Sequence, residues 1–289
     1  GDQFLLGKID QVRIFNKALT STEVTTLYNE VQCVPTIVPT DNFEPVLYTG
    51  DGGTQPITSL DFRPDFTWIK AREASSSHVL FDSVRGVSNV ISSESTSSQS
   101  SLAPNGLTAF NNDGFTVKDI ASGNYGVNGS AGGTYSGTNA EYVAWNWKSG
   151  GAPTATNSAG AGNVPTAGSV KIDGADSTTA LAGTIAATSI SANTDSGFSI
   201  VKYTGNGNNS TIGHGLSTAP DLIITKGIDS VVGNTNWLVY NSISGATGRM
   251  FLNLSLGFTI GSSAYNDTEP TSSVFTIGTT GDINGNGAA

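Results

Sequence analysis

The feature that most constrains the fold of this chain is an internal repeat. The octet FEPVLYTG at residues 43–50 returns as FSIVKYTG at residues 198–205, with Phe, Val, Tyr, Thr and Gly at matching places. Four further blocks recur in the same order, and one of them pairs HVLFDSVRG (residues 78–86) with WLVYNSISG (residues 237–245). Self-similarity of this extent predicts two copies of one structural unit in tandem.

Both copies have the pattern of β-strands joined by tight turns. In the segment YVAWNWK (residues 142–148), successive side chains would point to opposite faces of a strand, with Val143, Trp145 and Trp147 on one face and Tyr142, Ala144 and Asn146 on the other. The sequences GDGG, NNDG and NG mark turns, because their residues tolerate positive φ. The 36 glycines and the low charged fraction of 12% disfavour long helices. We therefore predict an all-β fold of tandem β-sandwich or jelly-roll-like domains, with one short helix near the N-terminus.

That helix is expected to begin next to Thr20. Thr20 is a suitable N-cap residue, Glu23 completes a capping box three positions later, and the helix would continue through Tyr28. Before it, residues 8–15 alternate as a strand. The string GKIDQVRIFNKALTSTEVTTLYN resembles the closing strand and helix of LamG-like, concanavalin A-type jelly-roll domains. The resemblance implies that most of such a domain precedes this chain, which we expect to be an excerpt of a longer polypeptide.

The repeat, the resemblance and the composition together predict the domain organisation. The second copy stops before a counterpart of YVAWNWK, so its last strand is expected to be missing. The predicted segments are the incomplete jelly-roll end (1–31), a Pro-rich linker (32–42), β-sandwich repeat 1 (43–149), a flexible Gly/Ala/Thr-rich linker (150–168) and β-sandwich repeat 2 (169–289).

Charge and cysteine content exclude several classes of partner. With a net charge of −10 and 13 Lys plus Arg, the chain lacks the clustered cations that neutralise phosphates, so no nucleic acid partner is expected. No run approaches the roughly 20 apolar residues of a membrane span, so no membrane insertion is expected. Cys33 is the single cysteine, and no intrachain disulfide can form.

The residues that could carry catalysis lack the required neighbours. His78 falls in a strand and His214 in a glycine-flanked loop, and neither has a G-x-S-x-G motif. Asp61 and Asp65 could form the carboxylate pair of a glycosidase. However, Asp61 becomes Ser217 in the second copy, and Asp65 follows a proline at a strand entry, which favours a turn cap. The prediction is a protein that is not an enzyme.

No cofactor or metal is predicted either. Asp51 in GDGG and Asp113 in NNDG could offer oxygen ligands to Ca²⁺. Neither follows the spaced D-x-D-x-D-G loop with its distant Glu, so plain turns are favoured. The nucleotide, zinc and haem motifs are missing as well.

The tryptophans are the remaining candidates for ligand contact. An exposed indole can stack on a sugar ring, and Trp68 and Trp237 are the predicted glycan contacts. Trp145 and Trp147 share one face of a strand, which is more typical of a buried sandwich core than of a binding platform.

The complete repeat pattern resembles a domain of marine bacteriophage proteins. The pattern runs F-x-x-V-x-Y-T-G, then L-x-x-x-P-D before a strand that ends in Lys, then [FY]-[DN]-S, then an NG turn before YVAWNWK. It is similar to a repeat of tail fibres and other virion structural proteins, notably those of cyanophages, where LamG-like domains accompany it. The resemblance implies a place on the tail or capsid surface of a virion, outside the cell, among other virion proteins, and suggests a homo-oligomer.

The resulting hypothesis is a virion structural protein, either a tail fibre or a capsid-attached appendage, whose repeats act as spacers or as weak adhesion modules for host-surface glycans. Many copies on one particle would convert weak contacts into avidity. Two alternatives stay open, namely a carbohydrate-binding region of a secreted or cell-surface bacterial protein and a self-assembling extracellular filament, which unpaired strand edges would support.

Overall fold

The computed structural model of the chain describes residues 15–28, 39–73, 75–120, 124–129, 140–158, 163–229, 231, 233 and 235–289. The chain divides into two compact units, Gly1–Thr36 and Ile37–Ala289. Residues 8–14 of the expected N-terminal strand and residues 32–38 of the expected linker lie outside the described residues.

Helix α1 (Ser21–Tyr28) begins where its cap predicts. The backbone N–H of Glu23 donates to Thr20 Oγ1 at 3.3 Å, and the backbone N–H of Thr20 donates to Glu23 Oε2 at 2.8 Å. These reciprocal bonds are a capping box, which satisfies two N–H groups that the first turn leaves unpaired. The predicted helix and its cap are confirmed.

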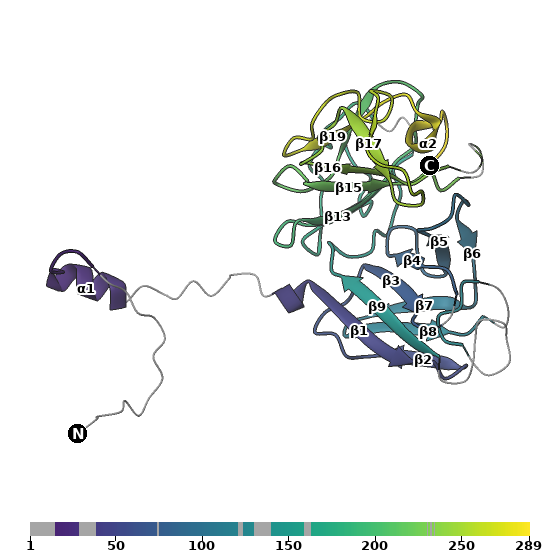
Figure 1. Cartoon of the computed structure of the whole chain (residues 1–289), viewed down its shortest axis with the longest axis horizontal. Helices are drawn as coiled ribbons and strands as arrows, with labels where there is room; N and C mark the ends of the chain where they lie inside the picture. The colour runs from purple at the N-terminus through teal and green to yellow at the C-terminus, as the bar shows by residue number, and fades with distance from the viewer. Residues whose placement is uncertain are drawn as a thin grey trace. The chain divides into compact units, whose positions relative to one another are not determined.

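In repeat 1 the regular structure of the described residues consists of strands, preceded by a 3-10 turn, η1 (Pro39–Asp41). Its strands are β1 (Phe43–Thr49), β2 (Thr54–Ile57), β3 (Phe66–Ala71), β4 (Val79–Asp82), β5 (Asn89–Ser92), β6 (Ser100–Ser101), β7 (Gly106–Asn111), β8 (Gly114–Lys118) and β9 (Glu141–Trp147). Two sheets form, a six-stranded sheet in the order β1-β9-β3-β4-β5-β6 and a three-stranded sheet in the order β2-β8-β7 (Figure 1).

The two sheets of repeat 1 enclose one hydrophobic core. Ile69, Phe81 and Tyr142 from the larger sheet meet Leu107 and Phe115 from the smaller one, and all five are buried. A core between the inner faces of two sheets defines a β-sandwich. The predicted all-β fold is confirmed.

The face of β9 that supplies this core corrects one expectation. Tyr142, Ala144 and Asn146 are fully buried, whereas Trp145 and Trp147, which were expected in the core, are half-buried on the opposite face. Alternation identifies two faces of a strand but does not say which one meets the second sheet. Here Tyr142 and the smaller Ala144 and Asn146 point inward, and the Tyr142 ring stacks on Tyr48 with ring centroids 5.1 Å apart.

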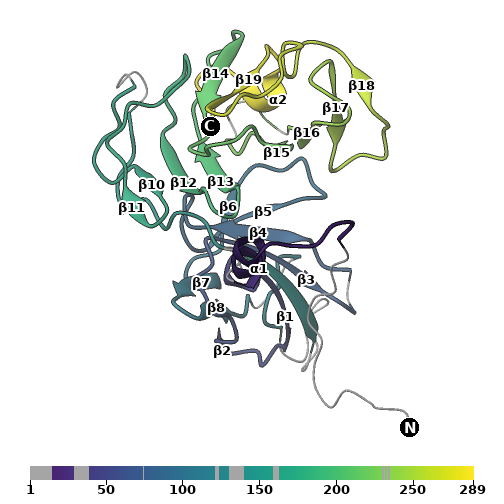
Figure 2. The ribbon, with the colours of Figure 1, turned by 90° about the vertical axis from the view of Figure 1, so that its left-hand side faces the viewer.

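Repeat 2 is also built on strands, which form a different set of sheets. Its strands are β10 (Val170–Ile172), β11 (Ala175–Asp176), β12 (Ser189–Asn193), β13 (Phe198–Lys202), β14 (Ser210–Gly213), β15 (Leu222–Thr225), β16 (Leu238–Asn241), β17 (Gly248–Phe251), β18 (Thr259–Ile260) and β19 (Val274–Ile277), followed by helix α2 (Gly281–Asn284). The sheets are β11-β10-β12-β13, β14-β19 and β15-β16-β17-β18 (Figure 2).

Hydrogen bonds around the NG turn show that the two copies share detailed geometry. Tyr48 Oη donates to the carbonyl of Val127 at 2.6 Å, and Tyr203 Oη donates to the carbonyl of Ile283 at 2.7 Å. Burial raises the pKa of both tyrosines, so each hydroxyl stays a donor. The tyrosine of the repeated octet therefore ties its strand to the NG turn in both copies.

One substitution between the copies follows from strand pairing. Pro45 in β1 has no N–H to donate, and β1 is the edge strand of its sheet, so nothing is lost on its outer side. In repeat 2 the matching residue is Ile200, and β13 pairs with β12 on that side, with Ile200 opposite Ser191. Proline is therefore compatible with the first copy but would remove a ladder bond from the second.

Residues 150–168 are more ordered than a flexible linker, as far as they are described. The backbone N–H of Thr154 donates to the carbonyl of Gly168 at 2.8 Å. Asn157 is buried, where its Nδ2 donates to the carbonyl of Ala187 at 2.9 Å and its Oδ1 accepts from Ser169 Oγ at 3.0 Å. Small residues indicate backbone freedom, but they do not reveal that one buried asparagine will anchor the segment to repeat 2.

Candidate functional site

The feature with the most specific chemistry in this chain is the contact between the two repeats, here called the junction. Its apolar part is a separate cluster in which Leu80 and Ile91 of repeat 1 pack against Trp237 of repeat 2. Phe66 and Trp68 from repeat 1 and Ile228 from repeat 2 complete it at the margin. Both repeats therefore contribute large side chains to the junction.

Trp237 is the central residue of the junction. It is 4% exposed, and its indole Nε1 donates to the carbonyls of Ser92 at 2.9 Å and Ser95 at 3.2 Å. A buried Trp usually finds a partner for its N–H, and here two carbonyls of the other repeat serve. Trp237 was a predicted glycan contact, but a ring with no exposed face cannot stack on a sugar.

Trp68, the other predicted glycan contact, is partly buried in the same cluster. Its ring meets that of Trp145 edge to face, with centroids 6.3 Å apart and an interplanar angle of 70°. This packing uses the ring for the junction rather than as an open platform.

The segment of residues 92–99 acts as a clamp on repeat 2. The carbonyl of Thr96 accepts from Lys226 Nζ at 3.1 Å and from the backbone N–H of Thr235 at 3.1 Å. The N–H of Gln99 donates to the carbonyl of Ile228 at 3.0 Å. Burial lowers the pKa of Lys226 to about 8, partly opposed by the charge of Asp282. The clamp therefore combines backbone pairing with a partly desolvated lysine.

A second group of contacts lies at the start of β13. The rings of Phe198 and Trp147 stack, with centroids 6.0 Å apart and an interplanar angle of 20°, and Phe198 also approaches Phe66 at 6.0 Å. Ser149 Oγ donates to the carbonyl of Ser191 at 2.6 Å. The outward face of β9, misassigned to the core by alternation alone, therefore serves the junction.

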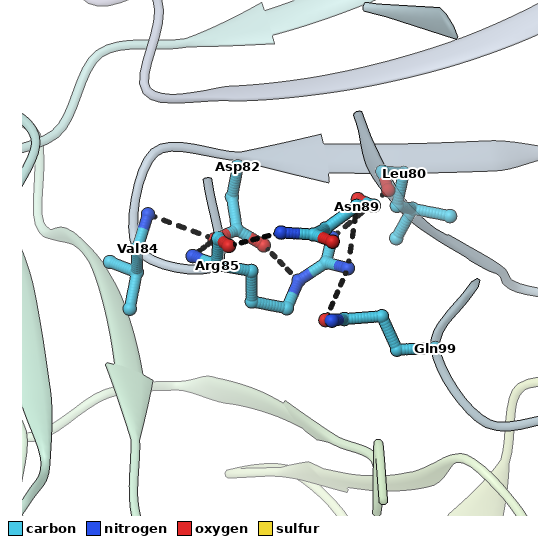
Figure 3. Close-up of polar contacts among 6 residues, drawn as sticks. All are labelled: Leu80, Asp82, Val84, Arg85, Asn89 and Gln99. Atoms are coloured by element: carbon cyan, nitrogen blue, oxygen red, sulfur yellow. Dashed lines mark hydrogen bonds and ion pairs between the residues drawn. The ribbon is translucent and has the colours of Figure 1, made fainter. Parts of the chain in front are cut away.

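A buried ion pair supports the clamp from within repeat 1. Asp82 and Arg85 are 5% and 6% exposed, and Arg85 Nε donates to Asp82 Oδ2 at 2.5 Å. The same guanidinium donates to the carbonyls of Leu80 at 3.0 Å and Asn89 at 3.1 Å, and to Gln99 Oε1 at 3.3 Å (Figure 3). Because Gln99 also bonds to Ile228, the arginine connects the β4–β5 turn to the clamp.

Repeat 2 folds the matching turn without the ion pair. Asn241 stands at the place of Asp82, and its Oδ1 accepts from the backbone N–H groups of Ile243 at 3.1 Å and Ser244 at 2.9 Å. Asp82 Oδ1 makes the same kind of bonds to Val84 and Arg85. A side-chain oxygen is thus what the turn requires, and the charge pair is an addition of repeat 1.

Of the two carboxylates considered for catalysis, Asp65 has structural partners. Asp65 is buried, and its Oδ1 accepts from Arg63 at 2.6 Å, while its Oδ2 accepts from the N–H groups of Ser149 and Gly151, both at 3.0 Å. Asp65 therefore holds the segment that follows β9 as well as Arg63 of its own turn. Asp61 is exposed.

The turn aspartate Asp51 is held by its own repeat. Its Oδ1 accepts from the N–H of Gly53 at 2.7 Å and from Asn128 Nδ2 at 2.8 Å, and these bonds lower the pKa of the carboxyl. Across the described ranges, no group of three or more His, Cys, Asp or Glu side chains is arranged to hold a metal ion. Within the same ranges, no helix has the length and apolarity needed to cross a bilayer.

His214 is buried in repeat 2, and its surroundings define its tautomer. Nδ1 accepts from the N–H of Leu216 at 3.1 Å, so the ring proton sits on Nε2, which faces the carbonyl of Thr271 at 3.1 Å. Burial lowers the pKa of His214, and the bond to Thr271 partly opposes this. The ring is a neutral structural element at neutral pH.

This burial predicts a loss of stability in mild acid. As the pH falls below the ordinary value of 6.5, the unfolded chain binds a proton at His214 before the folded chain does. The free energy of unfolding should therefore fall from that pH downward, by at most about 1.4 kcal/mol per pH unit for this one group. Urea unfolding at about pH 7.5 and about pH 5.5 measures it, and His214→Gln should show a smaller difference. Equal differences in the two proteins would contradict the prediction.

Two stretches of the chain, residues 38–174 and 167–289, match one family model, described as Domain of unknown function (DUF7483). The chain belongs to this family. The two DUF7483 matches correspond to the two copies found by self-similarity, and the junction is a contact between two members of the family. No match to a curated protein was found. No solved structure matched either.

The junction of the two DUF7483 repeats could be only partly foreseen. The aromatic residues were recognised as candidates, but the clamp of residues 92–99 is a serine-rich stretch with no apolar pattern. Its contribution comes from backbone carbonyls, which every sequence has. One signal was present in the sequence. His78 of repeat 1 corresponds to Trp237 of repeat 2, and a large apolar residue that is present in just one copy indicates a contact that the other copy lacks.

Proposed function

We propose that the chain is a non-enzymatic structural protein of a bacteriophage particle, a tail fibre or a capsid-attached appendage, in which DUF7483 repeats act as modules joined in series. The observation that carries this proposal is the junction. Trp237 is buried against repeat 1. Four backbone or side-chain N–H donors of the two repeats also form hydrogen bonds across the contact, and their acceptors are the carbonyls of Ser92, Ser95, Thr96 and Ile228.

A junction of this kind suits a rigid spacer. Interfaces between mobile domains of one chain are usually more polar, and relative motion is the default unless the contact is apolar and extensive. Here a buried aromatic cluster and the stacked rings of Phe198 and Trp147 join the two repeats. The resemblance of the repeat pattern to repeats of virion proteins supports the proposed location on the surface of a particle.

The proposal includes other virion proteins as partners, assembly as a homo-oligomer, and contact with host-surface glycans through many copies. It assigns no tryptophan platform to glycan contact, because Trp237 is buried and Trp68 packs on Trp145. Adhesion would then rest on residues outside the junction.

The test is to locate the chain on an intact particle. Antibodies raised against residues 37–289 would be used for immunogold electron microscopy of phage particles purified from a lysate that contains the chain. Gold on the tail or capsid is the expected result, with preimmune serum as the control. Gold on the bacterial surface, or the chain found only free in solution, would overturn the virion proposal in favour of a carbohydrate-binding region of a secreted or cell-surface protein.

A further inference from the structure

One hairpin has the same geometry in the two repeats but different side chains. In repeat 1 it joins β5 to β6 and contains the clamp, and in repeat 2 it joins β17 to β18 (Figure 2). Both strand pairs have the same register. The N–H of Ser93 donates to the carbonyl of His78 at 3.1 Å, and the N–H of Leu252 donates to the carbonyl of Trp237 at 3.2 Å. The two hairpins can therefore be compared residue by residue.

The hairpin is rich in serine in repeat 1 and apolar in repeat 2. Residues 92–101 read SSESTSSQSS, and residues 251–260, here called the apolar hairpin, read FLNLSLGFTI. The exposed apolar residues of this segment are Leu252 (36%), Leu254 (39%), Leu256 (59%), Phe258 (40%) and Ile260 (81%). Side chains of this size add little to the fold of repeat 2 while they face water, and grouped exposure of apolar residues indicates a contact surface.

Phe258 lies directly against the backbone of its own hairpin. A Cβ added to Gly248 of β17 would come within 2.6 Å of the Phe258 ring. The counterparts of these two residues in repeat 1 are Asn89 and Gln99. Repeat 2 therefore has a glycine at the place where the ring needs room, and the ring is still 40% exposed.

The strand at the end of the apolar hairpin is a sheet edge. β18 is last in the order β15-β16-β17-β18, across the sheet from β15. The N–H of Gly261 donates to the carbonyl of Thr247 at 2.9 Å on the β17 side, so the backbone groups of the adjacent Ile260 point away from β17. Edge strands commonly carry a charge or a proline that discourages pairing with another chain. Residues 250–266 contain neither.

The distribution of charge favours a protein partner over a lipid surface. The chain has a net charge of −10, which opposes association of two copies, but a contact made through residues 250–266 brings no charges together. Residues 227–289 contain a single cation, Arg249, and its Nη1 donates to Ser263 Oγ at 3.1 Å. An anionic membrane surface attracts segments with clustered Lys and Arg. The apolar hairpin lacks such a cluster.

The apolar hairpin is not a second clamp. The clamp bonds to repeat 2 through its backbone, as when the carbonyl of Ser95 accepts from Trp237 Nε1 at 3.2 Å. Small side chains allow that close approach. Leu254 stands at the place of Ser95, and its larger side chain would hold a facing backbone away. An apolar surface is therefore the better partner for the hairpin of repeat 2.

We propose that the apolar hairpin is a self-association surface, on which two copies of this chain pair about a two-fold axis. The two β18 edges pair antiparallel with the Ile260 residues opposite each other, and the leucine and phenylalanine side chains of the two copies cover one another. A two-fold contact requires a self-complementary patch, and an uncharged apolar surface beside an unblocked edge is one. The proposal specifies the homo-oligomer of the proposed function, and its test is separate from that of the virion location.

The experiment measures the mass of the full chain by analytical ultracentrifugation from about 1 to about 100 μM. We expect an equilibrium between monomer and dimer. Ile260→Glu places like charges opposite each other and removes an apolar contact, so the dissociation constant should rise at least about tenfold. Ile260→Lys should have the same effect. An equimolar mixture of the two variants should recover the dimer, because opposite charges then face each other.

Two further variants locate the surface. Leu47→Glu changes a residue that is 65% exposed on β1, the edge strand of repeat 1, and should leave the dimer unchanged. The triple variant Leu254→Ser, Leu256→Ser and Phe258→Gln copies repeat 1 and should be monomeric; circular dichroism melts verify that it folds.

Several results would overturn the proposal. These are a chain that is monomeric over the whole range, a dimer that persists in Ile260→Glu, and a mixture of the Glu and Lys variants that stays monomeric. Oligomers that grow beyond the dimer would indicate a head-to-tail contact instead. A monomer that cosediments with phosphatidylcholine vesicles, and loses this binding in Ile260→Glu, would assign the apolar hairpin to lipid.

Discussion

Replacing Trp237 with alanine is expected to lower the free energy of unfolding by about 3–5 kcal/mol, the range for large aromatic residues removed from a core. Trp237 is buried between the repeats, and its loss would leave a cavity and deprive the carbonyls of Ser92 and Ser95 of their donor. Urea unfolding followed by circular dichroism measures the change. The clamp of residues 92–99 should also become a site of rapid proteolysis, because its bonds to repeat 2 depend on the same contact.

The matched control is Trp237→Phe. It keeps a ring in the junction but removes the indole N–H, so it should cost less than the alanine variant, with about 1 kcal/mol or somewhat more coming from the lost hydrogen bonds. A loss below about 1 kcal/mol for Trp237→Ala would mean that the repeats are stable without the contact. The view of the junction as a stabilising interface would then be wrong.

Arg85→Ala is expected to have an effect of similar size, about 3–5 kcal/mol, because it leaves a buried carboxylate without its partner. Asp82 is 5% exposed, and the guanidinium also satisfies the carbonyls of Leu80 and Asn89. Unfolding in guanidinium chloride near neutral pH measures the loss. Because Arg85 bonds to Gln99, the variant should also increase hydrogen exchange at the Gln99 amide in the clamp.

Repeat 2 supplies the control for this prediction. The double variant Asp82→Asn and Arg85→Ser copies Asn241 and Ser244, which form the same turn without a charge. It should be more stable than Arg85→Ala, since no buried charge remains unpaired. If the double variant were as unstable as Arg85→Ala, the cost would come from lost packing of the arginine rather than from the orphaned aspartate.

Much of the fold follows from local patterns that hold wherever the chain is placed. The capping box of Thr20 and Glu23, the strand of residues 142–148 and the NG turns depend on neighbours in sequence, and each appears as expected. Which face of that strand points into the core is not determined by neighbours in sequence. It was assigned to the tryptophans because they are large, but the sandwich buries Tyr142 and Ala144 instead.

The candidate site was harder to predict because its bonds are long-range. Trp237 and the carbonyl of Ser92 are far apart in sequence, and a carbonyl carries no sequence signal. Trp68 and Trp237 were selected because an indole can stack on a sugar ring. In the structure both rings pack against other residues of this chain. Asp65 shows the same limit, since its Oδ2 bonds to Ser149 and Gly151 rather than to its own turn.

The sequence by itself determined that the chain holds two copies of one β unit, that their turns fall at glycine and asparagine, and that a short capped helix precedes them. These features arise from periodicity and backbone preference, which are local. The tertiary structure alone decided which face of β9 is buried and that a serine-rich segment clamps repeat 2. Each depends on which strands become neighbours, and that is decided by burial of the whole sheet rather than by any one segment.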